Sequence, residues 1–169
     1  MNKMQLTGAT DQLFTAELRQ QIDQWVNKYP EGQSQSAVIP ALHILQAENN
    51  GSLTQDLMDA LAVYLGMPSI SVYEVATFYS MYELKPVGKH LISVCTNISC
   101  MLCGSEDVVK HLNDKLGVGF GETTTDGKIT LKEVECLGAC CGAPMMQVGR
   151  DYHETLTTEK IDQILDGLE

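Results

Sequence analysis

Four segments of the N-terminal half carry apolar residues three or four positions apart, which is the spacing of one face of a helix. The predicted helices, with their bounding residues, run from Thr15 to Pro30, from Ser36 to Asn49, from Leu57 to Gly66, and from Ser71 to Pro86. Ser71 and Glu74 match a capping box at the start of the fourth helix. We therefore expect a small helical bundle, and the pattern places no cluster of titratable side chains on it.

The fourth predicted helix carries a dense aromatic and methionine face. Its members are Tyr73, Phe78, Tyr79, Met81 and Tyr82. We expect most of these side chains to lie in the core of the bundle. Some are available to a partner, because tyrosine and methionine suit partner surfaces.

The pattern changes after Gly88, where short strand patterns replace the helical spacing. The predicted elements are a strand over 90–95, a helix over 106–116, a hairpin over 123–135 around Asp126-Gly127, a strand over 144–148 and a helix over 158–168. The order β-α-β-β-β-α predicts a small open sheet with helices packed on it, in a thioredoxin-like arrangement.

Together the two patterns predict an α+β chain. An N-terminal helical bundle domain covers residues 1–88, and a thioredoxin-like α/β domain covers residues 89–169. The break between them, Pro86-Val87-Gly88, is short.

The charge of the chain excludes two classes of partner. Lys and Arg number 11 against 22 Asp and Glu, so the formal net charge is −11. Such a chain lacks the basic surface by which proteins hold nucleic acid or anionic lipid. Residues 90–169 are the more acidic part, with 13 acids and 6 bases. No segment approaches the ~20 apolar residues that span a membrane, so we expect no direct membrane insertion.

All six cysteines lie in one stretch, Cys95 to Cys141, and the first 94 residues have none. The N-terminus has no apolar run of the kind found in secretory signals. We therefore expect a soluble intracellular protein whose thiols are reduced or bound to metal, rather than a secreted disulfide scaffold.

Two loops each supply a pair of cysteines. Cys95 ends a predicted strand and Cys100 follows in the next loop, while Cys136 ends the second hairpin arm and Cys140 follows it. Each iron of a binuclear iron–sulfur cluster takes two protein thiolates, so four thiolates in two pairs favour such a cluster. Gly138, inside the second pair, lets backbone N–H groups approach the sulfurs.

Other uses of these thiols stay open on spacing alone. A structural zinc site also takes four cysteines, and Cys100 to Cys103 has the C-x2-C spacing, although the other pair does not. A thioredoxin-type dithiol would also use Cys100 and Cys103, but would give no role to Cys95. The spacing Cys95-x4-Cys100-x2-Cys103, with Cys136 downstream, is typical of plant-type ferredoxins, so spacing does not decide between Cys103 and Cys140.

The sequence has no pattern for binding a nicotinamide, a flavin or a nucleotide phosphate. Residues 117–121 are glycine-rich but do not fit G-x-G-x-x-G, and no P-loop pattern occurs. The four histidines show no paired spacing, and we expect them to be structural or exposed: His43, His90, His111 and His153. A redox protein of this kind must take electrons from a partner that holds the organic cofactors.

Both cysteine loops resemble one family. The segments that carry the resemblance are 94–102 (VCTNISCML) with Gly104-Ser105, 135–140 (ECLGAC), 143–146 (APMM), 41–46 (ALHILQ) and 72–79 (VYEVATFY). They are similar to the thioredoxin-like [2Fe–2S] subunit of respiratory complex I, the NADH:quinone oxidoreductase, which is called the 24 kDa subunit in mitochondria. The resemblance covers nearly the whole chain.

This resemblance implies a ligand set and a role. Cys95 and Cys100 would hold one iron and Cys136 and Cys140 the other, in one [2Fe–2S] cluster. The chain departs from the family pattern at Cys103 and Cys141, which we interpret as non-ligating. There would be no catalytic residue, because the chain would be an electron carrier and an enzyme only as a subunit of the NADH:quinone oxidoreductase, a translocase.

The resemblance also implies partners and a location. FMN and NADH would lie on the flavin- and NADH-binding subunit of the same complex, with a neighbouring iron–sulfur subunit next to it. A bacterial chain of this family would be cytoplasmic, peripheral on the cytoplasmic face of the inner membrane. The alternatives are the equivalent small subunit of an NAD-linked hydrogenase or formate dehydrogenase, a stand-alone thioredoxin-like ferredoxin, and a zinc-stabilised interaction domain.

Overall fold

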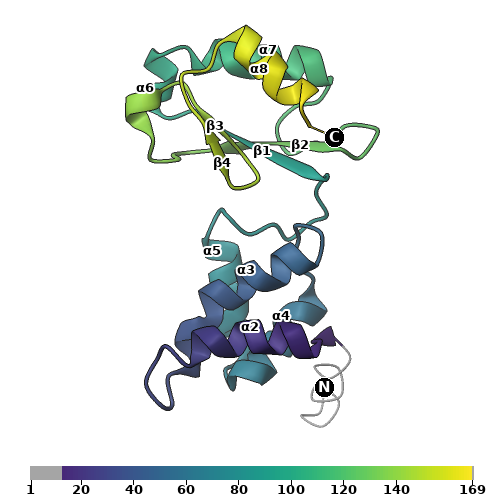
Figure 1. Ribbon diagram of the computed structural model, residues 1–169, viewed down its shortest axis with the longest axis vertical. Helices are drawn as coiled ribbons and strands as arrows, with labels where there is room; N and C mark the ends of the chain where they lie inside the picture. Colours follow the sequence, from purple (N-terminus) through teal and green to yellow (C-terminus); the bar gives the residue numbers. More distant parts are fainter. Residues whose placement is uncertain (1–12, 169) are drawn as a thin grey trace. The chain divides into compact units, whose positions relative to one another are not determined.

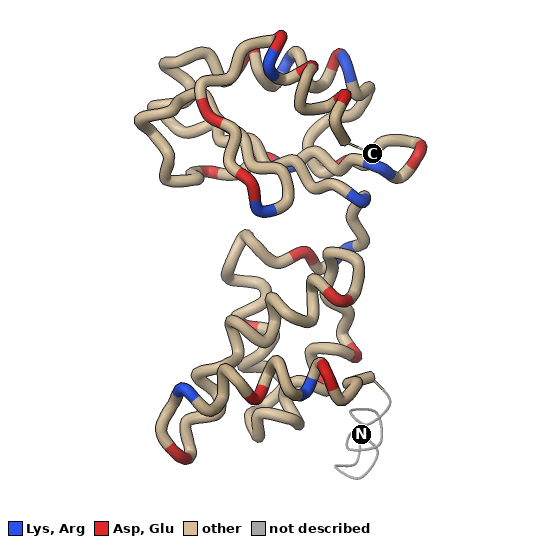
Figure 2. The backbone as a smooth tube through the Cα atoms, in the orientation of Figure 1, with Lys and Arg blue, Asp and Glu red and all other residues tan. Residues whose placement is uncertain are grey.

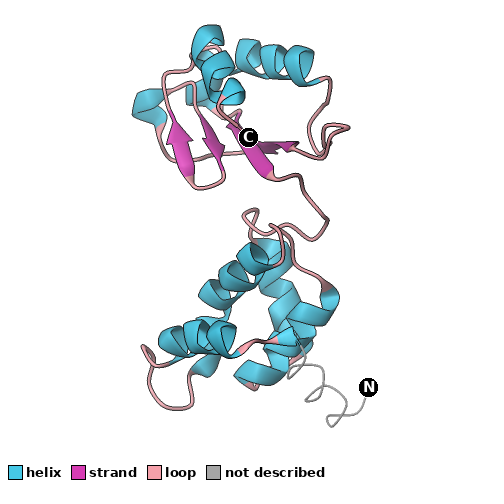
Figure 3. Cartoon of the chain, turned by 45° about the vertical axis from the view of Figure 1, so that its right-hand side comes forward, coloured by secondary structure: helices cyan, strands magenta, loops and turns pink. Residues whose placement is uncertain are grey.

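The computed structural model describes residues 13–168. The chain divides after Pro86 into two compact units. The first is helical and the second combines a sheet with helices (Figure 1; Figure 3). The sequence-based boundary after residue 88 lies two residues beyond this division.

From Phe14 to Pro86, the helical unit contains four α-helices and a 3-10 helix. They are α2 (Ala16–Val26), η1 (Ser34–Ala37), α3 (Val38–Glu48), α4 (Gln55–Leu65) and α5 (Ser69–Phe78). Thr15 caps α2, since its hydroxyl accepts the Leu18 N–H at 3.2 Å. Gly66 ends α4 at φ +69°, a left-handed conformation that glycine adopts without steric cost. The helices predicted at Thr15, Ser36 and Leu57 are therefore confirmed.

One continuous apolar core holds this unit together. Side chains from all four α-helices are fully buried in it: Ile22, Leu42, Leu45, Leu61 and Val72. Each such leucine or isoleucine contributes roughly 1.5–3 kcal/mol of transfer free energy on burial.

The fourth helix was predicted wrongly at both ends. α5 begins at Ser69, directly after Pro68, whose extended backbone serves as N-cap, so the predicted capping box at Ser71 is not used. The helix ends at Phe78 because the next segment is held by bonds to α3 and to the loop that follows it. Leu53 N–H donates to the Glu83 carbonyl at 2.7 Å, and Glu83 N–H donates to Gln46 Oε1 at 2.7 Å.

The aromatic and methionine face is also less buried than predicted. Tyr82 is 5% exposed and its hydroxyl donates to the Ile39 carbonyl at 2.9 Å. Phe78 is 80% exposed, and Tyr79 and Met81 are exposed as well. Tyr79 and Met81 follow the end of α5 and so do not continue its buried face, while Phe78 lies on the exposed side of its last turn.

The second unit is a four-stranded mixed sheet with helices. Its elements are β1 (His90–Cys95), α6 (Ile98–Leu102), α7 (Ser105–Leu116), β2 (Ile129–Val134), η2 (Cys140–Gly142), β3 (Met146–Val148), β4 (Asp151–His153) and α8 (Thr158–Asp166). The strand order is β2-β1-β3-β4. β1 pairs in parallel with β2 and antiparallel with β3, so α6 and α7 form the crossover that a parallel pair requires.

Helices α7 and α8 lie on the same side of this sheet (Figure 1). A second apolar core fills the layer between them, with buried side chains that include Ile92, Leu112, Leu131, Met146 and Ile161. The α+β class and the thioredoxin-like arrangement predicted for this part are confirmed.

Two details of the sheet differ from the prediction. The first arm of the predicted hairpin forms a single antiparallel bridge, Thr123 to Thr130, instead of a strand. The additional strand is instead β4, which pairs with β3 and was not predicted. The reason is that β4 is an edge strand with exposed Asp151 and Tyr152, so it lacks the apolar alternation typical of a strand.

The charged residues of the second unit are spread over its helices and loops, with basic positions dispersed among acidic ones (Figure 2). Ionic contacts join α7 to α8: Asp162 accepts from both His111 Nε2 and Lys115 Nζ at 2.8 Å, and Lys115 Nζ lies 3.6 Å from Asp166 Oδ1. Within residues 13–168, no helix combines the length and the apolar character needed to cross a membrane.

Candidate metal centre

The sheet topology brings the two cysteine loops to one edge. Cys95 is the last residue of β1, and Cys136 follows the parallel strand β2, so both lie at the carboxyl ends of neighbouring strands. β3 runs the other way and begins there, so residues 140–145 enter at the same edge. Backbone bonds fix the meeting point, because Cys95 N–H donates to the Met145 carbonyl and Thr96 N–H to the Val134 carbonyl, both at 3.3 Å.

Cys95 and Cys100 form a buried thiol pair. They are 3% and 1% exposed, and with Met145 they make a small apolar group separate from the main core of the unit. Leu137 and Ala139, from the loop between Cys136 and Cys140, pack against this group. The second cysteine loop therefore covers the first pair of thiols.

The Cys100 thiol is held in its protonated form. Burial raises its pKa to about 11, and the hydrogen bond and charge of Cys95 and the charge of Cys140 act in the same direction, against a backbone hydrogen bond at Met145. Cys100 thus interacts with one residue of each loop. Because only the thiolate binds a metal, Cys100 would have to release its proton to act as a ligand.

Cys136 and Cys140, in contrast, are exposed. The loop between them turns at Gly138, whose φ of +76° strains any residue with a Cβ. This conformation directs the Gly138 N–H to Cys136 Sγ at 3.3 Å. A backbone amide therefore does reach a candidate ligand sulfur, in the way that the position of Gly138 suggested.

The structure corrects the local placement of three candidate ligands. Cys100 lies inside α6 and not in a loop, because the Asn97 side chain accepts the Ile98 N–H at 2.7 Å and begins a helix there. Cys136 lies two residues beyond the end of β2, and Cys140 begins η2. The helix α6 was not predicted because its apolar residues Ile98 and Leu102 face solvent.

The geometry does not suit a thioredoxin-type dithiol at Cys100 and Cys103. Cys103 lies at the C-cap of α6 and is exposed, whereas Cys100 is buried. A reactive dithiol needs a thiol of lowered pKa, typically at a helix N-terminus. The pKa of Cys100 is shifted in the opposite direction.

Two residues that shape the site were not anticipated. Met145 packs directly on the buried thiols, and the Tyr152 hydroxyl donates to the Leu137 carbonyl at 2.8 Å, which fixes the second cysteine loop. Met145 was noted only as part of the segment 143–146 and of the predicted strand over 144–148, with no role at the site. Tyr152 gave no signal, because its role depends on the unpredicted pairing of β4 with β3.

The donor set fits a binuclear cluster. A [2Fe–2S] cluster takes two thiolates at each iron, and here two loops that contact each other carry two cysteines each. Thiolate sulfur is also the usual protein ligand of the iron in such clusters.

Comparison with known proteins supports the same chemistry. The model of the family described as thioredoxin-like [2Fe–2S] ferredoxin matches residues 22–169. The chain is 48% identical over 144 residues to an NADH-quinone oxidoreductase subunit of Rickettsia conorii, with 85% of this chain and 86% of that protein covered. It is 41% identical over 155 residues to the mitochondrial NADH dehydrogenase [ubiquinone] flavoprotein 2 of Dictyostelium discoideum, with 92% and 63% covered.

Among solved structures, the air-oxidized NAD+-reducing [NiFe]-hydrogenase has a chain that superposes with a TM-score of 0.66 at 18% identity, covering 78% of this chain and 22% of that one. Identity this low shows a shared fold alone. The match to the family model and the identity to the two oxidoreductase subunits show that the chain belongs to the family of thioredoxin-like [2Fe–2S] subunits of NADH-quinone oxidoreductase, the family of the 24 kDa subunit.

Proposed function

We propose that this chain is an electron-transfer subunit of an NADH-quinone oxidoreductase, and that Cys95, Cys100, Cys136 and Cys140 hold its one [2Fe–2S] cluster. The observation that carries the proposal is the meeting of the two cysteine loops at one sheet edge. There Cys100 interacts with both Cys95 and Cys140, in a chain of the thioredoxin-like [2Fe–2S] family. When bound, the cluster would supply reversible one-electron redox chemistry.

The protein groups have separate tasks in this proposal. Cys95 and Cys100 bind from the buried side, where Met145 and the covering loop exclude water. Cys136 and Cys140 bind from the exposed side, so a redox partner approaches there. The Gly138 N–H, which donates to Cys136 Sγ, stabilises negative charge on that sulfur and so favours the reduced form.

The partner that we propose is the flavin- and NADH-binding subunit of the same complex, together with its neighbouring iron–sulfur subunit. The relatives named as NADH-quinone oxidoreductase subunits support this assignment, as does the lack of nucleotide-binding patterns in this sequence. In a bacterial cell the chain would lie at the cytoplasmic face of the inner membrane as a peripheral part of the complex.

A cysteine-to-serine series tests the ligand set. Cys95→Ser, Cys100→Ser, Cys136→Ser and Cys140→Ser should each lower bound iron and visible absorption, with Cys140→Ser as the critical variant. Cys141→Ser is the matched control, since Cys141 is an exposed neighbour of Cys140. Cys103→Ser distinguishes this ligand set from the plant-type set, in which Cys103 takes the place of Cys140. Retention of iron in Cys140→Ser together with loss in Cys103→Ser would overturn the assignment.

A reduction experiment tests the partner. We expect NADH to bleach the visible absorption of the purified chain only after the flavin-bearing subunit is added. Dithionite is the control, and should bleach the chain without any partner. Bleaching by NADH alone would contradict the proposal, as would no bleaching in the reconstituted pair.

A further inference from the structure

A pocket lies beside the candidate metal centre and on none of its ligands. It has a volume of about 460 Å³, within the range of cavities that bind ligands. It opens between α6, the outer face of α7 and the loop that follows α7. Its lining includes Thr96 and Met101, each of which directly follows a candidate ligand in the sequence.

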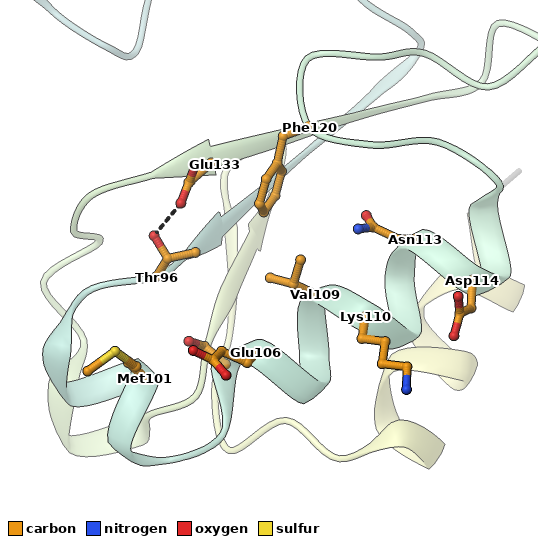
Figure 4. A pocket seen from close by; sticks show the side chains of 10 residues that line it. Thr96, Met101, Glu106, Val109, Lys110, Asn113, Asp114, Phe120 and Glu133 are labelled. Carbon is orange, nitrogen blue, oxygen red and sulfur yellow. Dashed lines mark hydrogen bonds between the residues drawn. The ribbon is translucent and has the colours of Figure 1, made fainter.

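One wall of the pocket is apolar. Phe120 reaches from the loop toward Val109 on α7, and the Met101 side chain lies at the α6 end (Figure 4). Met101 is 46% exposed although it is apolar. An occupant must therefore present a hydrocarbon or flat surface to these three side chains.

The polar groups of the pocket favour a hydrogen-bond donor with positive charge. Three carboxylates line it, those of Glu106, Asp114 and Glu133. Glu106 and Glu133 stand at the α6 end, where Glu133 accepts the Thr96 hydroxyl at 2.8 Å. The pocket's single lysine, Lys110, points away from Phe120 (Figure 4).

We propose that this pocket receives an arginine side chain from a neighbouring subunit. A guanidinium is planar, always charged and carries five donors, so it can stack on Phe120 while it donates to Glu106 or Glu133. The methylene stem covers Val109 and Met101. A lysine offers a compact charge without the flat face, and an acidic or neutral side chain leaves the carboxylates unpaired.

The net negative charge of the second half of the chain also favours a basic segment of the partner. Residues 90–169 hold 13 acidic and 6 basic residues, which attract a basic segment over a distance of about 10 Å at moderate salt. An arginine seated here would place its backbone beside the residues that follow Cys95 and Cys100. The identity of the partner as a subunit of the complex rests on the proposed function, whereas the pocket itself does not.

The first test uses small probes on the whole, iron-loaded chain. N-acetyl-L-arginine methylamide should shift the NMR signals of the Asn113 side-chain amide and the Val109 methyl groups, saturating in the millimolar range. The matched probe is the citrulline analogue, which has the same shape without the charge. It should bind at least about tenfold more weakly, because charge-assisted hydrogen bonds are lost. Equal binding of the two probes, or shifts away from these residues, would overturn the inference.

Variants of the lining residues test whether the carboxylates of the pocket bind the arginine probe. Glu106→Gln combined with Glu133→Gln should weaken binding of the arginine probe about tenfold. Asp107→Asn is the control for Glu106→Gln, since it lies in the same first turn of α7 but does not line the pocket. Iron content is measured in every variant. Retained iron with unchanged probe binding in the double variant would overturn the arginine pocket and leave the ligand assignment untouched.

The second test identifies the occupant in the purified complex. Lys110 is replaced by the photoreactive residue p-benzoylphenylalanine, because Lys110 is an exposed rim position. Irradiation should attach a peptide of another subunit that contains an arginine near the cross-linked position. No adduct, or an adduct on a segment without arginine, would refute the docking of an arginine here.

Discussion

The helical unit and the sheet unit bury their apolar residues in different ways. In the helical unit, one continuous core joins α2, α3, α4 and α5. In the sheet unit, the main core between the sheet and its helices is separate from a small group made of Cys95, Cys100 and Met145. The first unit therefore has a complete core without a cofactor. The second has two buried thiols at one edge of its sheet. Binding of a metal by these thiols would add stability that the apolar core does not supply.

Removal of the iron should have the largest effect, and this effect should be confined to the sheet unit. Chelation under reducing conditions should speed amide hydrogen exchange in residues 95–103 and 134–146 by at least about tenfold, which corresponds to ~1.4 kcal/mol of lost local stability. A small domain relies on its metal to supplement a limited core. Amides in α3 and α4 serve as the internal control and should not change. Uniform acceleration in both units would contradict this picture.

Truncation of a core side chain in the helical unit should have the opposite pattern, because it lowers the stability of that unit and leaves the iron content unchanged. Leu42 is fully buried, so Leu42→Ala should lower the free energy of unfolding of this unit by about 2–5 kcal/mol. Urea unfolding followed by far-UV circular dichroism measures the loss. The matched control is Leu84→Ala, at an exposed leucine of the same unit. Iron content should stay the same in both variants, and a loss of iron in Leu42→Ala would show that the units depend on each other.

Alkaline pH should destabilise the helical unit through its tyrosines. Burial, with the charge of Tyr79, raises the pKa of Tyr82 to about 12, and burial with a hydrogen bond to Asp23 raises that of Tyr64 to about 12. An unfolded tyrosine ionises near pH ~10. The stabilising contribution is therefore complete below about pH 10 and disappears as the pH rises through about 12.

Tyr82→Phe separates the two parts of this effect. At neutral pH it removes the hydrogen bond to the Ile39 carbonyl and should cost about 1 kcal/mol. Between about pH 10 and 12 the stability of the variant should fall less steeply than that of the parent chain. Tyr29→Phe, at an exposed tyrosine, is the control in urea titrations at both pH values. Identical pH slopes for Tyr82→Phe and the parent chain would refute the assignment.

The smallest effect concerns the surface contact between α7 and α8. Hydrogen bonds from Lys115 and His111 lower the pKa of Asp162, so its contribution is present above about pH 4 and is lost as the pH falls through the folded-state pKa. Asp162→Asn should destabilise the sheet unit slightly at neutral pH and not at all in strong acid. Asp151→Asn is an exposed control. An equal effect of Asp162→Asn at both pH values would contradict this role.

Local pattern was sufficient wherever an element has one apolar face. The spacing of Leu57 and Leu61 predicted α4, and the run His90 to Cys95 predicted β1 with the observed bounds. Prediction failed where long-range bonds decide the structure. The end of α5 depends on Gln46 and Leu53, and the exposed strand β4 depends on its pairing with β3.

The candidate site was predictable only in part for the same reason. Spacing alone identified the cysteines but left Cys103 and Cys140 equivalent, and family resemblance supplied the choice between them. Their surroundings follow from tertiary packing, which buries Cys100 beside Met145 and leaves Cys103 exposed at the end of α6. Neither property is encoded in the distance between cysteines along the chain.

The most direct test of the central claim is the metal content of the chain purified without oxygen. We expect a brown protein with about two irons and two acid-labile sulfides per chain, and a reduced-state EPR signal of a [2Fe–2S] cluster after dithionite treatment. The sulfide count distinguishes a cluster from iron bound by thiolates alone. A colourless protein that carries one zinc and no sulfide would contradict the account.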